Sequence, residues 1–376
     1  MRSFVGVEPL RDHPLPRLVT RALGSLPASV QSLVRRAPAL GDPTRWQSQV
    51  IGGQVCRIAR PVTFTPYAAA QACSARCTFC SENLRLDGVV SAAALLRPGE
   101  QYFEQLAQAL SQLRGLEMGY SLSGLEFTDN PRWMLRTLEV LQAHESHGRI
   151  TEKVLYTNTS GFASSAGPAL IERLRSMAVG LEVSRHSNEP TRNQAIMRFR
   201  SPMGVSDQGV FESALRGLAA QLELALVCIV QRGGVEDADQ VLDYLTWARS
   251  LGIRRVVFRE YSQLSPRHIL NATARHIAEH RVAVGELLAS CLKLPALAAD
   301  LELSCLTDGY YFWNLTGSFR ELQVTFEASD YETMLREHAS GRIYKLVFHA
   351  NGNLCAGWNP ETDVLWSARG ARHGAE

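Results

Sequence analysis

The sequence predicts an α/β fold in which parallel strands alternate with helices along residues 61–265. Short apolar runs recur there, and the segments between them carry apolar residues at three- and four-residue intervals, the spacing of an amphipathic helix. Strict alternation of the two patterns indicates parallel βα units. About six strands can be counted, fewer than the eight of a closed barrel. Most runs end in polar residues, and chemistry in such folds collects at the carboxyl ends of the strands.

The expected elements follow one another along the chain. The predicted strands cover residues 61–66, 118–126, 153–158, 179–184, 222–230 and 256–260. The predicted helices cover residues 102–113, 170–177, 211–218 and 241–251, with one more that begins at Pro131. Gly252 follows the last of these helices and is an expected helix stop.

Two flanking regions complete the predicted organisation. Residues 1–60 are predicted to form an N-terminal extension, with one or two helices in residues 18–34 and a hairpin that turns at Gly52-Gly53. Residues 266–376 are predicted to form an α+β region that caps the open barrel. The elements expected in that region are a long helix at 272–292, strands at 301–305, 319–326 and 344–349, and a tight hairpin turn at 351–353.

Composition and charge exclude several classes of protein. The net charge of +2 gives no basic field for nucleic acid. No run of about 18 apolar residues is present, so no membrane span is expected. The N-terminus lacks the continuous apolar core of a secretory signal. Reduced thiols together with a metal site would place the protein in the cytoplasm.

Three cysteines form the most specific motif in the chain. Cys73, Cys77 and Cys80 lie at C-x3-C-x2-C spacing, and Phe79 stands directly before the last of them. Thiolates are the usual ligands of iron–sulfur clusters, and three ligands would leave one iron of a [4Fe–4S] cluster open to a small molecule. The alternatives are a zinc site, which normally needs four ligands, disulfides, which need an oxidising compartment, and chance clustering among eight cysteines.

This motif, with an aromatic residue before its last cysteine, resembles the signature of the radical S-adenosylmethionine (radical SAM) enzymes. The resemblance implies a partial (β/α)6 barrel of TIM type over residues 61–265 and a [4Fe–4S] cluster on Cys73, Cys77 and Cys80, shielded by Phe79. It also implies SAM bound at the open iron, an external one-electron reductant of flavodoxin or ferredoxin type, and a 5′-deoxyadenosyl radical.

Residues 230–237, followed by a helix and Leu251-Gly252-Ile253, resemble the fifth βα unit of the enzyme that begins molybdenum-cofactor synthesis. Many relatives carry auxiliary clusters in the C-terminal region, which need grouped cysteines. Here Cys291, Cys305 and Cys355 are widely spaced and are expected to be buried thiols.

The resemblance also implies residues that hold SAM. Ser123, Gly124 and Glu126 match the position of a Gly-Gly-Glu-type motif that binds the amino group, although Ser123 and Leu125 depart from its common form. Glu126 could instead be an ordinary loop carboxylate, and Arg198 a surface ion pair. The other implied SAM contacts are Asn158 near the ribose or the substrate, Ser184 at the ribose or the carboxylate, Arg198 at the carboxylate, and Gln231 and Gly233 beside the adenine.

The candidate residues for substrate contact lie at or just after the carboxyl ends of the predicted strands: Tyr156, Arg185, His186, Asn188, Arg259, Glu260 and Tyr261. His186 could be a general acid or base, or a hydrogen-bonded barrel residue. Arg185 and Arg259 suggest an anionic substrate group, but either could pair with Glu182 or Glu260.

Three functions remain open on this sequence. The first is a radical SAM enzyme that abstracts hydrogen from a small polar metabolite, in natural-product or cofactor biosynthesis. The second is radical modification of a peptide, and the third is a metal-cluster module without radical chemistry. Formation of 5′-deoxyadenosine from SAM would separate the enzymes from the module.

Overall fold

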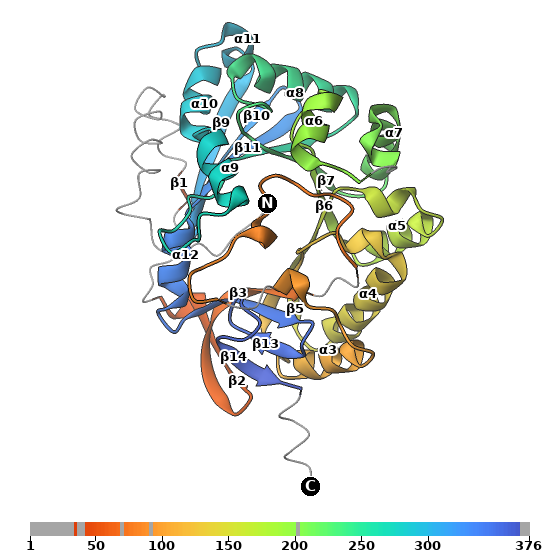
Figure 1. Ribbon diagram of the computed structural model, residues 1–376, viewed down its shortest axis with the longest axis vertical. Coiled ribbons are helices and arrows are strands. Elements are labelled where there is room, and N and C mark those ends of the chain that lie inside the picture. Colours follow the sequence, from red (N-terminus) through yellow and green to blue (C-terminus); the bar gives the residue numbers. More distant parts are fainter. Residues whose placement is uncertain (1–33, 36–41, 68–70, 90–92, 201–203, 369–376) are drawn as a thin grey trace.

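A computed structural model describes residues 34–35, 42–67, 71–89, 93–200 and 204–368. Its centre is a curved sheet in which six parallel strands follow one another in chain order, with helices on the outer side (Figure 1). This confirms the predicted α/β fold with a partial barrel. The six strands are β3 (Gln54–Tyr67), β4 (Glu117–Leu122), β5 (Arg149–Thr157), β6 (Gly180–Ser184), β7 (Leu224–Ile229) and β8 (Arg255–Arg259).

The helices between these strands confirm the predicted ones within a few residues. Side-chain caps fix the starts of three of these helices: Asn130 accepts from the Trp133 N–H, and Asp207 and Asp237 cap two later helices in the same way. These helices are α3 (Tyr102–Ser111), α4 (Pro131–Glu145), α5 (Gly167–Ser176), α7 (Gln208–Ala219) and α8 (Ala238–Ser250). The sequence did not predict α6 (Pro190–Met197), because its apolar residues are confined to the last turn.

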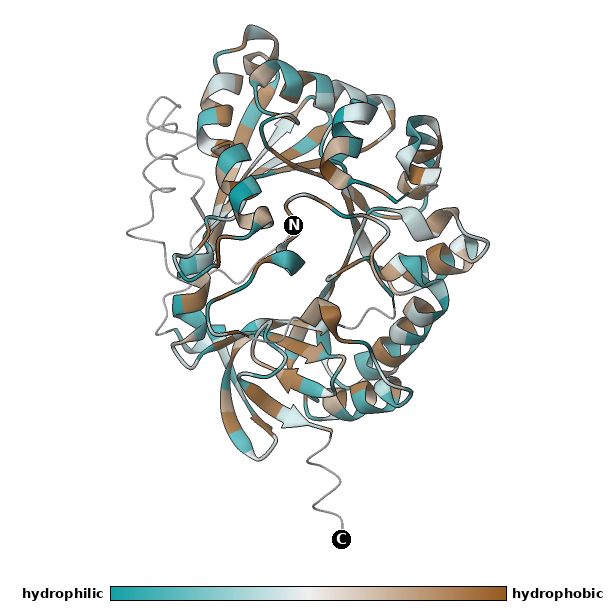
Figure 2. Cartoon of the chain, in the orientation of Figure 1, coloured by the Kyte–Doolittle hydropathy of each residue, from teal (hydrophilic) through white to brown (hydrophobic). Residues whose placement is uncertain are grey.

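Alternate residues of the strands face two different cores. Leu226 of β7 and Phe258 of β8 pack in the large core beneath the helices, whereas Ala225, Val227 and Val257 form a separate small cluster. Since successive strand residues point to opposite faces, the second cluster marks the inside of the barrel. Figure 2 shows hydrophobic residues concentrated along the strands, while the helices carry both hydrophobic and hydrophilic residues.

The C-terminal region joins the sheet at both edges, which the sequence did not predict. Strand β11 (Leu322–Ser329) pairs in parallel with β8, and β12 (Ile343–His349) pairs in parallel with β3. Five further strands extend these two edges: β1 (Val34–Arg35), β9 (Leu301–Asp308), β10 (Phe312–Phe319), β13 (Asn353–Cys355) and β14 (Val364–Ser367). The parallel barrel wall is therefore continued at one edge by β11 and at the other edge by β12.

Two C-terminal predictions are wrong. The expected strand 319–326 contains a turn at Arg320-Glu321, where Arg320 has a φ of 52°, so β10 and β11 form an antiparallel hairpin. The expected helix 272–292 is two helices, α9 (Ala272–His280) and α10 (Val284–Cys291), because the backbone of Arg281 is extended and ends the first of them. Short helices α11 (Pro295–Ala298) and α12 (Tyr331–His338) follow. The predicted turn at 351–353 is confirmed by antiparallel pairing of β12 with β13.

The hairpin predicted at Gly52-Gly53 is present and joins β2 (Trp46–Ile51) to β3. Strand β3 continues without a break through residue 60 into the barrel. The helices predicted in residues 18–34 lie outside the described residues, except that Val34 belongs to strand β1. No helix of the described residues is long and apolar enough to cross a membrane.

Candidate functional site

The cysteine loop follows the carboxyl end of β3. Cys73, Cys77 and Cys80 are half-buried free thiols. Burial raises the pKa of Cys73 to about 12 and that of Cys80 to about 11, and it raises the pKa of Cys77 further, with help from the two other thiols. In the described part of the chain, no three His, Cys, Asp or Glu side chains gather around a single ion position. An iron–sulfur cluster takes each thiolate on a different iron, so three soft donors on one loop suit such a cluster.

Backbone hydrogen bonds hold this loop against the segment that follows α6. The Arg76 N–H donates to the Met197 carbonyl (3.0 Å), and the Thr78 N–H donates to the Ile196 carbonyl (3.0 Å). Arg198 has a left-handed φ of 49° and ends α6, which turns the chain along the loop. Its exposed side chain was expected at the SAM carboxylate; the structure shows a role for its backbone conformation.

Phe79, which belongs to the cysteine loop, packs against residues from other segments of the chain. The Phe79 ring lies 4.9 Å from the His186 ring and 5.5 Å from the Tyr261 ring, measured between centroids. The Tyr261 hydroxyl donates to Gln231 Oε1 at 2.6 Å. Phe79, His186 and Gln231, which the sequence singled out, are therefore brought together at the ends of β6, β7 and β8.

His186 is held as a neutral ring. Its Nδ1 accepts a hydrogen bond from the Ile229 N–H at 3.0 Å, so a neutral ring carries its proton on Nε2. Burial, followed by the charges of Arg185 and Arg259, lowers the pKa of His186 to about 3. Near neutral pH this side chain is a hydrogen-bond donor and not a cationic acid.

We expect this buried ring to make the protein acid-sensitive. The unfolded chain takes up a proton near pH 6.5 and the folded ring near pH 3, so folding stability falls as the pH falls through that window, by about 5 kcal/mol at most. Urea unfolding of the wild type and His186→Gln between pH 7.5 and 4.5 measures the effect. An equal slope of unfolding free energy against pH in both proteins would contradict it.

Glu126 joins the ends of β4 and β5 beneath the loop. It is 4% exposed. Its Oε1 accepts from Thr128 Oγ1 (2.6 Å), the Thr128 N–H and Thr157 Oγ1 (2.7 Å), and its Oε2 accepts from the Asn158 N–H (2.6 Å). Burial nevertheless raises the pKa of Glu126 to about 7. The carboxylate expected to bind the SAM amino group is thus already bonded to four donors of its own chain.

A second polar network fixes the residue next to Cys73. The Ser74 N–H donates to Asp129 Oδ2 (2.6 Å), and Asn158 Nδ2 donates to Ser74 Oγ (3.0 Å). Ser160 Oγ also donates to Asp129. These bonds connect the cysteine loop to the ends of β4 and β5. A cavity of about 320 Å³ lies beside the network, between Cys73, Asp129 and Arg200.

The first residues after β4 have steric reasons for their identity. Gly124 has a φ of 95°, and a Cβ there would lie 1.9 Å from the Tyr67 ring. The Tyr67 hydroxyl donates to Glu82, just past the last cysteine. Ser123 Oγ lies 3.2 Å from Ser121 Oγ. The close packing of Tyr67 therefore favours glycine at position 124, independently of any ligand.

Gly161 offers a sharp test of this packing. A Cβ at Gly161 would lie 1.7 Å from the Thr128 carbonyl oxygen, and backbone cannot move aside cheaply. We expect Gly161→Ala to lower the free energy of unfolding by about 2 to 3 kcal/mol. Gly217→Ala in α7, where nothing lies within 4 Å, should raise it by about 0.5 to 1 kcal/mol. Equal unfolding free energies of Gly161→Ala and Gly217→Ala in urea titrations would contradict the close approach of Gly161 to the Thr128 carbonyl.

Two candidate substrate contacts point away from the barrel interior. Arg185 donates to the Val205 carbonyl and to Gln208, and its guanidinium lies 4.3 Å from the centroid of the Phe211 ring. Glu260 pairs with Arg281 and accepts from the Val284 N–H at 2.9 Å. Arg185 and His186 follow the last residue of β6, and their contacts differ: His186 packs on Phe79 of the cysteine loop, whereas Arg185 packs on Phe211 of α7. Both side chains thus bond within their own chain, and contact of Arg185 and Glu260 with substrate stays a prediction.

The barrel interior contains an arginine between two carboxylates. Arg259 bonds to Glu327 of β11, and its Nη2 lies 3.3 Å from Glu182 Oε2. Tyr156 is the Cα partner of Glu182 on the neighbouring strand. This arginine is already neutralised, so it leaves no unpaired cation for an anionic substrate.

The two remaining expected residues lie at strand ends. Ser184 is the half-buried last residue of β6. Gly233 has a φ of 78° in the turn after β7, where its N–H lies 3.3 Å from Glu236 Oε1. Sequence reasoning missed Tyr67, Glu82 and Asp129, which contact the cysteine loop or the residues beneath it.

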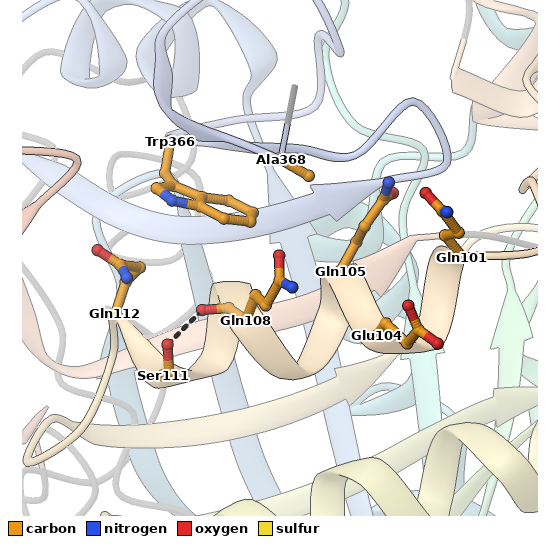
Figure 3. A pocket seen from close by; sticks show the side chains of 8 residues that line it. All are labelled: Gln101, Glu104, Gln105, Gln108, Ser111, Gln112, Trp366 and Ala368. Atoms are coloured by element: carbon orange, nitrogen blue, oxygen red, sulfur yellow. Dashed lines mark hydrogen bonds between the residues drawn. The ribbon is translucent and has the colours of Figure 1, made fainter. Parts of the chain in front are cut away.

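A second cavity, of about 290 Å³, lies between α3 and the end of β14 (Figure 3). Four of its eight lining residues carry a carboxamide, and none of the eight was expected at the site. The lining residues are Gln101, Glu104, Gln105, Gln108, Ser111, Gln112, Trp366 and Ala368.

Comparison with known proteins gives distant structural similarity. No family model and no curated protein matches the chain. SuiB from Streptococcus suis, solved bound to S-adenosylmethionine, is 13% identical with a TM-score of 0.46, over 79% of this chain and 60% of SuiB. The protein anSMEcpe, solved with bound AdoMet, is 15% identical with a TM-score of 0.39, over 53% of this chain and 50% of anSMEcpe.

The chain thus spans 50 to 60% of the length of these two solved chains. Because their TM-scores lie below 0.5, the similarities do not by themselves assign an activity, a substrate or a ligand to this protein.

Proposed function

We propose that this chain is a radical SAM enzyme that abstracts hydrogen from a small polar metabolite. The observation that carries the proposal is the position of Cys73, Cys77 and Cys80: three free thiols on one backbone-clamped loop at the carboxyl end of β3. Their spacing resembles the radical SAM signature, and their soft donor atoms suit iron and sulfide.

The ends of neighbouring strands supply groups suited to SAM. Ser123 and Gly124 follow β4, Ser184 ends β6, and Gln231 follows β7. When bound, the cluster would supply the electron that cleaves SAM to methionine and a 5′-deoxyadenosyl radical. An external one-electron reductant and a role in natural-product or cofactor biosynthesis belong to the same proposal.

The chain's own residues would protect and orient the reacting groups. Phe79, His186 and Tyr261 form an aromatic wall behind the cysteine loop, which excludes water from the space where a reactive carbon radical would be formed. His186 presents a neutral ring, so it can donate a hydrogen bond without adding charge. Glu126 and Asp129 hold the loop in place through Asn158 and Ser74.

Anaerobic reconstitution with iron and sulfide tests the proposal. We expect about four irons per chain, an electron paramagnetic resonance signal after dithionite reduction that changes when SAM is added, and 5′-deoxyadenosine as a product. A cluster that forms but yields no 5′-deoxyadenosine from SAM would favour a non-enzymatic module. A tetrahedral zinc on the same loop would overturn the proposal.

A further inference from the structure

Lysine is rare in this chain, and one lysine has an unusual position. Of the 39 Lys and Arg residues only Lys153, Lys293 and Lys345 are lysines. Lys153 pairs with Glu145 at 2.9 Å, and Lys293 is exposed after α10. Lys345 is in the middle of strand β12, within an apolar run.

The pairing of β12 shows which way Lys345 points. Phe348 lies 5.4 Å from the Tyr102 ring of α3, so the even-numbered residues face the helices. His349, on the other face, is the Cα partner of Tyr67, and the centroids of their rings lie 5.8 Å apart. Lys345 alternates with His349 and pairs with Thr63, so it faces the barrel interior, deeper than Tyr67.

The ammonium of Lys345 rests on an aromatic ring. Its Nζ lies 4.0 Å from the centroid of the Trp358 ring, and that ring meets Tyr67 edge-on at 5.8 Å. No carboxylate of the described residues forms an ion pair with it. Burial lowers the pKa of Lys345 to about 8. The nearby His338 and His349 have pKa values lowered to about 4, so both are neutral at pH 7.

Burying an ammonium without an anion is unfavourable, and a ring offsets part of that cost. Within the described barrel interior, Arg259 is shared between two carboxylates, whereas the three N–H donors of the Lys345 ammonium have no carboxylate partner. An anion that entered the barrel would therefore find its strongest attraction at Lys345.

We propose that Lys345 is a substrate-binding residue that holds a carboxylate or phosphate group of the molecule on which the barrel acts. The proposal rests on the proposed enzymatic function, which it deepens by naming the charge that the substrate presents. Trp358 positions the ammonium of Lys345, and Thr63 is the partner of Lys345 on the neighbouring strand β3.

Nuclear magnetic resonance of reductively methylated lysines tests the site directly, because methylation keeps the charge and three lysines give few signals. The probes are inorganic phosphate and succinate, each compared with sodium chloride at equal ionic strength, on the full-length protein under anaerobic conditions. Lys345→Met assigns the signal of Lys345. Lys153 and Lys293 are internal controls in the same spectrum.

We expect the Lys345 methyl signal to titrate near pH 8 and to shift with at least one probe, with its pKa raised by about one unit when the anion binds. A response to phosphate alone assigns a phosphate group, and a response to succinate alone assigns a carboxylate. Shifts no larger than those of Lys293 with both probes overturn the proposal. Because the readout needs no SAM cleavage, an inactive protein with a responsive Lys345 would refute the enzymatic function alone.

Discussion

Replacing Cys73, Cys77 and Cys80 together by alanine is expected to abolish both the cluster and SAM cleavage. The three thiols are the donors of one loop, and a cluster that loses all of them has no protein ligand left. Anaerobically reconstituted triple variant should show background iron content and form 5′-deoxyadenosine at below about 1% of the wild-type rate. Iron analysis, absorption near 400 nm and product chromatography make the measurement.

Cys305→Ser is the matched control. Cys305 is half-buried like the three loop cysteines, but it lies on β9 in the C-terminal region. The Cys305→Ser variant should bind a reconstituted cluster and cleave SAM as the wild type does. A triple variant that still binds a complete cluster would reject the assignment of the loop, and loss of the cluster in Cys305→Ser would show that the loop is not the sole anchor.

The second large effect is expected from Glu126→Gln. The carboxylate accepts four hydrogen bonds, whereas an amide has one accepting oxygen, and its NH2 group would face donors. Leaving buried donors unsatisfied should lower the free energy of unfolding by about 3 kcal/mol, in the absence of SAM. Urea unfolding of the protein without SAM measures this loss.

Glu104→Gln on the exposed face of α3 is the control, and we expect its stability to stay within about 0.5 kcal/mol of wild type. The comparison separates two roles for Glu126. If its carboxylate serves only the amino group of SAM, Glu126→Gln will unfold as the wild type does and will differ only in SAM binding.

The arrangement of the barrel could be predicted from the sequence because its signals are local. The run 222–230, for example, contains β7, which is buried on both faces and so reads as a continuous apolar stretch. The C-terminal strands gave weaker signals. Residues 319–326 read as one strand because the turn at Arg320-Glu321 contains no glycine or proline.

The direction of side chains limited the prediction of the site. Arg185 and His186 are adjacent in sequence and were both expected to contact substrate, yet Arg185 packs on Phe211 of α7 and His186 packs on Phe79 of the cysteine loop. Glu126 and Asn158 were expected to contact SAM, and their bonds to each other could be seen only once β4 and β5 were paired.

The sequence by itself determined the run of parallel strands and the triad Cys73, Cys77 and Cys80, because hydrophobic periodicity and ligand spacing are both written within a few residues. The tertiary structure decided which charges are free: Arg259 lies between Glu182 and Glu327, while Lys345 lies on Trp358 without a carboxylate among the described residues. These partners are as far as 77 residues apart, and electrostatic pairing depends on distance in space, which no local pattern records.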